Sequence, residues 1–211
     1  MMAVEVFAAA FMLVAGAADR PVLPPRGDVA VTYRTTGAAA SLIPQGMPQG
    51  ISQGISRGGP AAGPADAPGQ MRLRWSSAGK LRLEAEGRPQ VLLLDTSGPS
   101  AFIVDSTLRS AISVPMKQRD LDAILLTNAD ITRVRQDRVA GLDCTVWSVH
   151  ARNREGTVCI TADGVPLRVE GTVDGRQGTL TATSVDASPQ PAALFQIPSG
   201  YMSFSLPKFG K

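Results

Sequence analysis

The sequence has few side chains of the kinds that carry out catalysis or bind metals. Among its 211 residues there are two cysteines, Cys144 and Cys159, and one histidine, His150. A nucleophile needs a base within hydrogen-bond reach, yet Cys144 and His150 would lie about 20 Å apart along an extended strand. A metal needs three or four converging ligands, and no cluster of acidic residues accompanies these three. We therefore expect no enzymatic activity, no metal and no cofactor, and interpret His150 as a solvated residue near a turn.

The sequence also lacks the second half of an aspartic-protease site. The segment "DTSG" at residues 95–98 resembles the signature of that class, but it occurs only once. The chemistry requires two aspartates that share a proton. We therefore expect Asp95 to begin a turn.

The chain has no concentrated charge of either sign. Its formal net charge is +3, and its basic residues are spread along strand-like segments without interleaved aromatic residues. Proteins that bind nucleic acid gather lysine and arginine on one face or stripe. The sequence therefore predicts no nucleic-acid partner.

No apolar run reaches the length of about 20 residues that a membrane-spanning helix needs. The run from Val6 to Ala15 is shorter and is followed by the small-x-small sequence Ala15-Gly16-Ala17. This predicts a signal peptide at residues 1–17 and a periplasmic or secreted protein. The segment before the run has Glu5 and no Lys or Arg, so an apolar N-terminal strand or helix is the alternative.

Aromatic residues are absent from residues 37–69, which contain eight glycines and five prolines. A near-repeat, "IPQG", "MPQG", "ISQG" and "ISRG", fills residues 43–58. Such a composition buries too little apolar surface to offset the entropy of ordering. We predict a disordered insertion at residues 37–70, after a first strand at 28–36 and before an antiparallel β domain at 71–206. The insertion is either a spacer or a partner-binding segment.

What the sequence does have is alternation of period two. Met71, Leu73 and Trp75 alternate with charged or polar residues, as do Leu81 and Leu83. Joined by "SAG", these segments predict a hairpin with one apolar and one charged face. Further strands are predicted at 90–95, 100–116, 131–141, 142–151, 156–164, 165–173 and 178–186.

One segment has helical spacing instead. Leu121, Ile124 and Leu125 form an apolar stripe, and Asn128 can end the helix. The predicted fold is therefore mainly β: a single curved antiparallel sheet, or half-barrel, with a short helical lid. A helix of about ten residues is about 15 Å long, whereas eight or so strands are more than twice as wide. We therefore predict an apolar cavity beside the lid. The expected wall residues are Leu73, Trp75, Leu81, Leu83, Leu92, Leu94, Ile103 and Trp147.

The two cysteines allow two interpretations. In an oxidising compartment they would pair, and strand alternation places both on the face opposite Trp147 and Val149. Direct pairing of Cys144 with Cys159 centres the turn between residues 151 and 152, but the turn-like "RNREG" centres nearer Arg154. That register offsets the cysteines by about four residues, beyond the ~7 Å Cα limit of a disulfide. A bulge or a longer loop would reconcile the two, and we favour the disulfide.

Three motifs also resemble a known family. The segments "VAGLDCTVWSV", "TADGVPLRVEGTV" and "ALFQIPSGY" are similar, in this order, to a family of exported bacterial domains (domain of unknown function 4412). That family looks like the periplasmic lipoprotein carriers of the Lol system. The resemblance covers roughly residues 71–204 and implies a curved, lipoprotein-carrier-like sheet with a helical lid over an apolar pocket. It implies no catalytic residues, and the Gly/Pro-rich insertion departs from it.

These observations favour a non-catalytic binding module for an apolar or amphipathic ligand, such as a lipid or acyl chain. The alternative is a structural or interaction protein of the cell envelope with a filled core. A pocket of about 300 Å³ or more would favour the first. We expect a monomer that makes at most peripheral contact with the envelope.

Overall fold

The structure, a computed structural model, describes residues 20–37, 69–98, 100–151, 154–173 and 175–205. The predicted signal peptide lies outside the described residues, and so does the predicted insertion apart from its ends. Gly37 ends the first strand, and Gly69 and Gln70 begin the second. No helix in the described part of the chain is long and apolar enough to cross a membrane.

Twelve strands form one sheet in the described residues, which confirms the predicted mainly β fold. In sheet order they run β12-β6-β5-β4-β3-β2-β1-β11-β10-β9-β8-β7. Their bounds are β1 Val29–Gly37, β2 Gly69–Trp75, β3 Lys80–Ala85, β4 Gln90–Asp95, β5 Ser100–Asp105, β6 Ser110–Pro115, β7 Asp130–Val139, β8 Leu142–Ala151, β9 Arg154–Ile160, β10 Pro166–Val173, β11 Arg176–Asp186 and β12 Met202–Ser205. All neighbours are antiparallel except β12 and β6, which are parallel.

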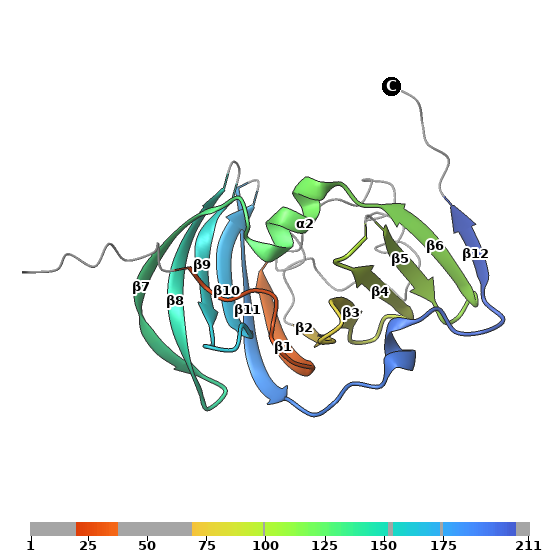
Figure 1. Cartoon of the computed structure of the whole chain (residues 1–211), viewed down its shortest axis with the longest axis horizontal. Coiled ribbons are helices and arrows are strands. Elements are labelled where there is room, and N and C mark those ends of the chain that lie inside the picture. The colour runs from red at the N-terminus through yellow and green to blue at the C-terminus, as the bar shows by residue number, and fades with distance from the viewer. Residues whose placement is uncertain (1–19, 38–68, 99, 152–153, 174, 206–211) are drawn as a thin grey trace, which may run out of the picture.

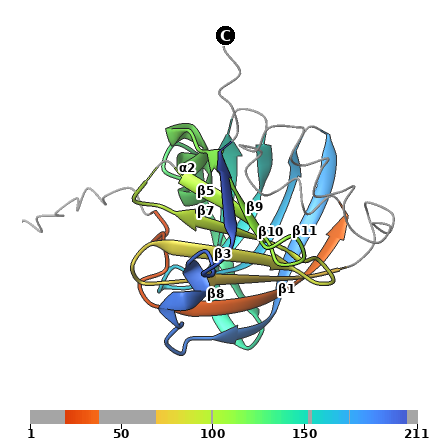
Figure 2. The ribbon, with the colours of Figure 1, turned by 90° about the vertical axis from the view of Figure 1, so that its right-hand side faces the viewer.

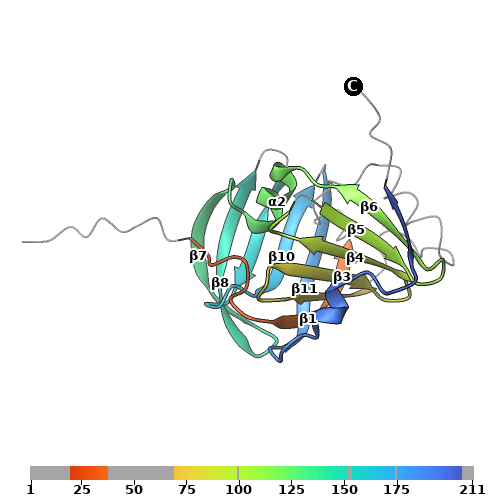
Figure 3. The same ribbon diagram turned by 45° about the vertical axis from the view of Figure 1, so that its right-hand side comes forward.

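The sheet curls so that β1–β6 and β7–β11 face each other across α2, the one α-helix among the described residues (Figures 1 and 3). We call the side that holds α2 the concave face. α2 comprises Gln118–Leu125. It begins where the Asp120 carboxylate accepts a hydrogen bond from the backbone N–H of Lys117 (2.9 Å).

The helix ends earlier than predicted. Leu126, with φ of 53°, takes the left-handed conformation, and the N–H of Thr127 donates to the carbonyl of Asp122. Asn128, the predicted terminator, lies beyond this cap and donates from its side chain to Asp122. The prediction was wrong here because Asp122 accepts hydrogen bonds from Thr127 and Asn128, which turn the chain after Leu125.

Strand register gathers the apolar residues into rows that cross the concave face. The first row is fully buried and consists of Val29, Trp75, Leu81, Leu94, Ala101 and Val114. The second row consists of Val31, Leu73, Leu83, Leu92, Ile103 and Ile112. Four of its members, Leu73, Leu83, Leu92 and Ile112, are only partly buried. Alternation thus puts one apolar surface under α2, as predicted.

The other face of β4–β6 is also apolar, and the C-terminal segment covers it. Leu93, Val104 and Ala111 are buried there, with Ile197 and Tyr201 packed against them. The short 3-10 helix η2 (Ala192–Phe195) lies against β3, where Arg82 Nη1 donates to the carbonyl of Leu194 (2.9 Å) (Figure 2). Burial on both faces explains the continuous apolar runs of β4 and β5.

Candidate ligand-binding site

An apolar cavity of about 110 Å³ lies on the concave face, between the sheet and its cover. It is lined by Leu23, Pro24, Pro25, Val29, Val31, Leu73, Trp75, Leu81, Ile124, Leu125, Val165 and Pro166. β1–β3 supply one wall, and the start of β10 supplies another. The cover consists of α2 and the segment of residues 20–27 before β1. No lining residue has a titratable side chain, so the cavity offers no acid or base.

The segment of residues 20–27 is held against the turn between β9 and β10. The N–H of Arg26 donates to the carbonyl of Asp163 (3.0 Å). Gly164, with φ of 88°, lets the two backbones approach, since a Cβ there would lie 2.8 Å from the carbonyl oxygen of Val22. Only glycine fits such a position without strain. The turn at Asp163 and Gly164 therefore also holds part of the cavity's cover.

Arg20 links the two parts of the cover. Its Nη2 lies 3.0 Å from the carbonyl oxygen of Leu126 and 3.1 Å from that of Ala129. Both carbonyls belong to the connection between α2 and β7. A cation at this position both pairs them and ties the helix to the N-terminal segment.

Tyr33 fixes the wall on the β10 side. It is 2% exposed, and its hydroxyl donates to the carbonyl of Pro166 (2.6 Å). Its partner on the intervening strand β11 is Ala182, whose small side chain leaves room for the ring to pass. Burial raises the pKa of Tyr33, so the phenol stays a neutral donor.

Asp28 fixes the corner before β1. Its carboxylate accepts hydrogen bonds from the N–H groups of Ser77 and Gln190, each at 2.7 Å. These bonds, that from Ser77 first, hold the pKa of Asp28 below its usual range. The residue therefore joins the β2–β3 turn and the C-terminal segment to the strand that carries Val29.

The predicted wall residues divide into three groups. Leu73, Trp75 and Leu81 line the cavity. Leu83, Leu92, Leu94 and Ile103 lie on the same face and belong to or pack against the same core, but do not line it. Trp147 lies outside the lining, in a cluster with Val158 and Ile160 against which Leu23 and Leu126 pack.

Sequence reasoning missed the parts of the lining that lie outside β2 and β3. Leu23, Pro24 and Pro25 come from a segment that was assigned no structure. A signal was present: two prolines beside a leucine, just before the first strand, are typical of an extended segment that cannot continue a ladder.

Trp75 brings the only polar group among the lining side chains. The residue is 5% exposed, and its indole Nε1 has no hydrogen-bond partner among the described residues. Its strand neighbours on the same face, Val29 and Leu81, are apolar and offer no side-chain acceptor. The other lining side chains are hydrocarbon.

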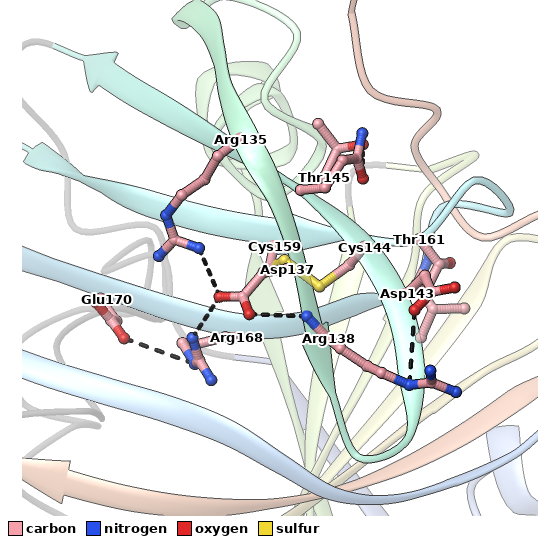
Figure 4. The surroundings of a disulfide bond; sticks show 12 residues. Arg135, Asp137, Arg138, Asp143, Cys144, Thr145, Cys159, Thr161, Arg168 and Glu170 are labelled. Atoms are coloured by element: carbon pink, nitrogen blue, oxygen red, sulfur yellow. Dashed lines mark hydrogen bonds and ion pairs between the residues drawn. A yellow bond between two sulfur atoms is a disulfide. The ribbon is translucent and has the colours of Figure 1, made fainter.

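The second half of the sheet is fastened by the predicted disulfide, which is confirmed (Figure 4). The Cα atoms of Cys144 and Cys159 are 5.4 Å apart, and both residues are buried. In the strand ladder, Asp137 of β7 lies opposite Cys144, and Arg168 of β10 lies opposite Cys159. The side chains of Asp137 and Arg168 form an ion pair at 2.9 Å. Asp137 also accepts from Arg135, the first cause of a pKa below its usual range. The ion pair therefore spans the strands that the disulfide joins.

The turn between β8 and β9 differs from the prediction. Ala151 pairs with Arg154 and Val146 with Cys159, without a register shift. The two strands are thus joined through residues 152–153, which lie outside the described residues, and the cysteines are offset by two residues instead of four. The prediction was wrong because Arg154 and Glu155 continue the ladder opposite Ala151 and His150. The Cα–Cα distance of this diagonal pair, 5.4 Å, is within the limit for a disulfide without a bulge.

Among the described residues, no group of three or more His, Cys, Asp or Glu side chains could hold a metal ion. The candidate site is the apolar cavity with its two-part cover.

No family model matches the chain, and no curated protein matches it. The resemblance to the 4412 family is thus not confirmed. Among solved structures, the chain is similar to one from a Pseudomonas aeruginosa MucA/MucB complex, at 15% identity and a TM-score of 0.46. That match covers 82% of this chain and 57% of the other, so this chain spans little more than half of its length.

Two shorter proteins match over most of their length. A LolA superfamily protein from Nitrosomonas europaea is 11% identical, with a TM-score of 0.41 and coverage of 82% of this chain and 91% of the other. The Mycobacterium tuberculosis lipoprotein LppX is 13% identical, with a TM-score of 0.42 and coverage of 78% and 88%. Similarity at this level assigns no function, and the fold follows from the strand pairing described above.

Proposed function

We propose that the chain is a non-catalytic binding module, periplasmic or otherwise in the cell envelope, for an apolar or amphipathic ligand such as a lipid or acyl chain. The carrying observation is the cavity: all twelve lining residues are apolar or aromatic, and its cover is a short helix and an extended segment rather than further strands. Pieces of this kind can move without breaking the sheet, because few backbone hydrogen bonds hold them.

The cavity is too small to hold a lipid or acyl chain unless part of the protein moves. At about 110 Å³ it is smaller than the ~150 Å³ engineered cavity that takes up benzene, and below the range of ligand pockets. A bound chain therefore requires α2 or residues 20–27 to move outward. The wall then continues along the second row, where Leu83 and Leu92 are partly exposed beside Leu73.

The small volume also favours the alternative of an envelope structural or interaction protein with a filled core. The two differ in whether the cover ever opens. Native mass spectrometry of protein purified from the periplasm addresses this directly, since a co-purifying lipid adds its mass to the folded chain. Binding of the neutral fluorescent probe N-phenylnaphthylamine gives a second measurement.

A matched pair of variants tests the site. Leu73→Trp fills the cavity from its wall, whereas Leu142→Trp makes the same change at an exposed position. We expect the first to weaken probe binding at least about tenfold, a loss of about 1.4 kcal/mol, and the second to leave it unchanged. Far-ultraviolet circular dichroism checks that both variants are folded. If the folded wild-type protein binds neither lipid nor probe, the filled-core alternative holds.

A further inference from the structure

Exposed apolar side chains gather at the β12 edge of the sheet (Figure 1). Among the described residues, five large hydrophobic side chains are exposed. Three of them form what we call the edge patch: Met202 and Phe204 of β12, 61% and 52% exposed, and Leu108 between β5 and β6, 68% exposed. The N–H of Met202 donates to the carbonyl of Arg109 (3.0 Å), which joins the strand to this turn. Single exposed apolar residues are ordinary, whereas a group of them marks an interaction surface.

The turn that carries Leu108 is fixed by a buried carboxylate. Asp105 is 9% exposed, and its Oδ1 accepts hydrogen bonds from the N–H groups of Thr107 and Leu108, each at 2.9 Å. Its Oδ2 accepts a hydrogen bond from the side-chain amide of Gln90 (2.6 Å). Asp105 therefore holds the turn in place, and its charge is buried.

The edge patch adjoins the partly exposed second row of the concave face. In the parallel ladder, Phe204 lies opposite Ile112, the last member of that row. Neighbouring residues across a ladder project from the same face, so Phe204 continues the row beyond β6, and Met202 shares its face. The second row thus runs from Val31, which lines the cavity, to an exposed aromatic ring at the edge of the sheet.

The sequence around the edge patch is basic. Arg109 follows Leu108, and two lysines, Lys208 and Lys211, come after β12 in the part of the chain outside the described residues. From residue 187 to residue 211 the sequence contains no Asp or Glu. Apolar side chains next to basic ones are typical of surfaces that bind anionic lipids, since burial and charge each supply part of the affinity.

The size of the edge patch favours a lipid surface over a folded partner. A specific protein interface takes about 20–30 residues a side. Three apolar side chains on one turn and a four-residue strand fall well short of that. A bilayer surface needs no matching shape, because lipids rearrange around the side chains that enter it.

We infer that the edge patch docks on the surface of a membrane that contains anionic phospholipid. Leu108, Met202 and Phe204 enter the headgroup region, and Arg109 pairs with lipid phosphates. The inference rests on the proposed function, because docking here places the open end of the second row at the bilayer, from which an acyl chain reaches the concave face.

Vesicle sedimentation with the purified protein tests the docking surface. The patch variant carries Met202→Ser and Phe204→Ser. The matched control carries Val134→Ser and Leu142→Ser, the other two exposed large hydrophobic residues, which lie at the opposite end of the sheet. With vesicles of phosphatidylglycerol and phosphatidylcholine, we expect the affinity of the patch variant to fall about tenfold, because apolar burial in the bilayer is lost. The control should stay within about twofold of wild type.

Three further measurements accompany this comparison. Wild type should bind vesicles of phosphatidylcholine alone severalfold more weakly, and Arg109→Gln should weaken binding to the mixed vesicles a few-fold. Far-ultraviolet circular dichroism checks that every variant is folded. N-phenylnaphthylamine should bind the patch variant and wild type equally without vesicles, because neither Met202 nor Phe204 lines the cavity.

The outcomes are distinct. Absent vesicle binding, or equal vesicle binding by the patch variant and the control, overturns the docking surface but leaves the binding function standing if the probe still binds. Equal affinity for the two kinds of vesicle overturns the anionic lipid. A wild-type dimer in analytical ultracentrifugation that the patch variant does not form also overturns the inference, since the patch then contacts a second copy. If wild type binds vesicles but not the probe, the docking surface holds and the binding function fails.

Discussion

The two halves of the curled sheet are built differently. β7–β11 are fastened by the Cys144–Cys159 disulfide, by the Asp137–Arg168 ion pair above it and by a closed cluster around Trp147. β1–β6 have long apolar rows without a covalent tie, and the second row is partly exposed. The cavity lies against β1–β3. Its cover is held in place by hydrogen bonds, including those of Arg20 and Arg26.

One half of the sheet thus has a covalent cross-link, and the other half offers an apolar surface that is incompletely filled. A binding surface must lack some internal contacts if a ligand is to replace them. Variants in the two halves should therefore separate stability from binding.

The largest effect is expected where packing is tightest. Leu167 in β10 has no exposed surface, so Leu167→Ala should lower the free energy of unfolding by about 3–4 kcal/mol, within the usual range for buried leucines. Leu73→Ala, at the partly filled cavity, should cost about 2 kcal/mol or less, because fewer contacts are lost. Urea denaturation with matched slopes measures both. Equal losses would show that the two halves are packed alike.

Removing the disulfide should come next. The cysteines are 15 residues apart, and a loop of this length stabilises the folded state by about 3 kcal/mol. We expect Cys144→Ser with Cys159→Ser to lower the unfolding free energy by about that amount, and reduction of the wild-type protein to have the same effect. Probe affinity should stay within about twofold in the folded variant, since neither cysteine lines the cavity. A severalfold drop in affinity would show that the halves are coupled.

Loosening the cover should have a smaller effect on stability. Arg20→Gln weakens the tie between residues 20–27 and the end of α2. We expect amide hydrogens in α2 to exchange roughly fivefold faster, which corresponds to about 1 kcal/mol, and the probe to bind faster. Arg26→Gln is the control, because Arg26 is held through its backbone N–H. Unchanged exchange in Arg20→Gln would mean that α2 is held by packing alone.

Acid should produce the smallest effects. The pKa values of Asp28 and Asp137 are both lowered from 3.8, so their stabilisation is present above the unfolded value and is lost as pH falls through the folded values. The urea midpoint should therefore decline below about pH 4, and Asp28→Asn and Asp137→Asn should each flatten the decline. Only Asp28→Asn should also change probe affinity, since Asp28 positions the strand that carries Val29. An identical decline in both variants and wild type would exclude these carboxylates as its source.

Much of the fold was predictable because strand alternation is local. The faces of Met71, Leu73 and Trp75, the hairpin with Leu81 and Leu83, and the helical stripe of Leu121, Ile124 and Leu125 can all be read from spacing. The disulfide was predictable from the expected oxidising compartment and the strand faces, whereas its register was not. Arg154, Glu155 and Gly156 of the turn-like segment proved to be strand residues, because their partners across the ladder decide this.

The sequence by itself determined which side chains share a face, because the period of two is a property of the extended backbone. It also determined that no acid, base or nucleophile set was to be expected. Only the tertiary structure decided which row of that face remains open and that Leu23 and Pro24 help to close the cavity. These depend on the curl of the sheet and on contacts between segments more than 50 residues apart in the chain, and no local pattern encodes such contacts.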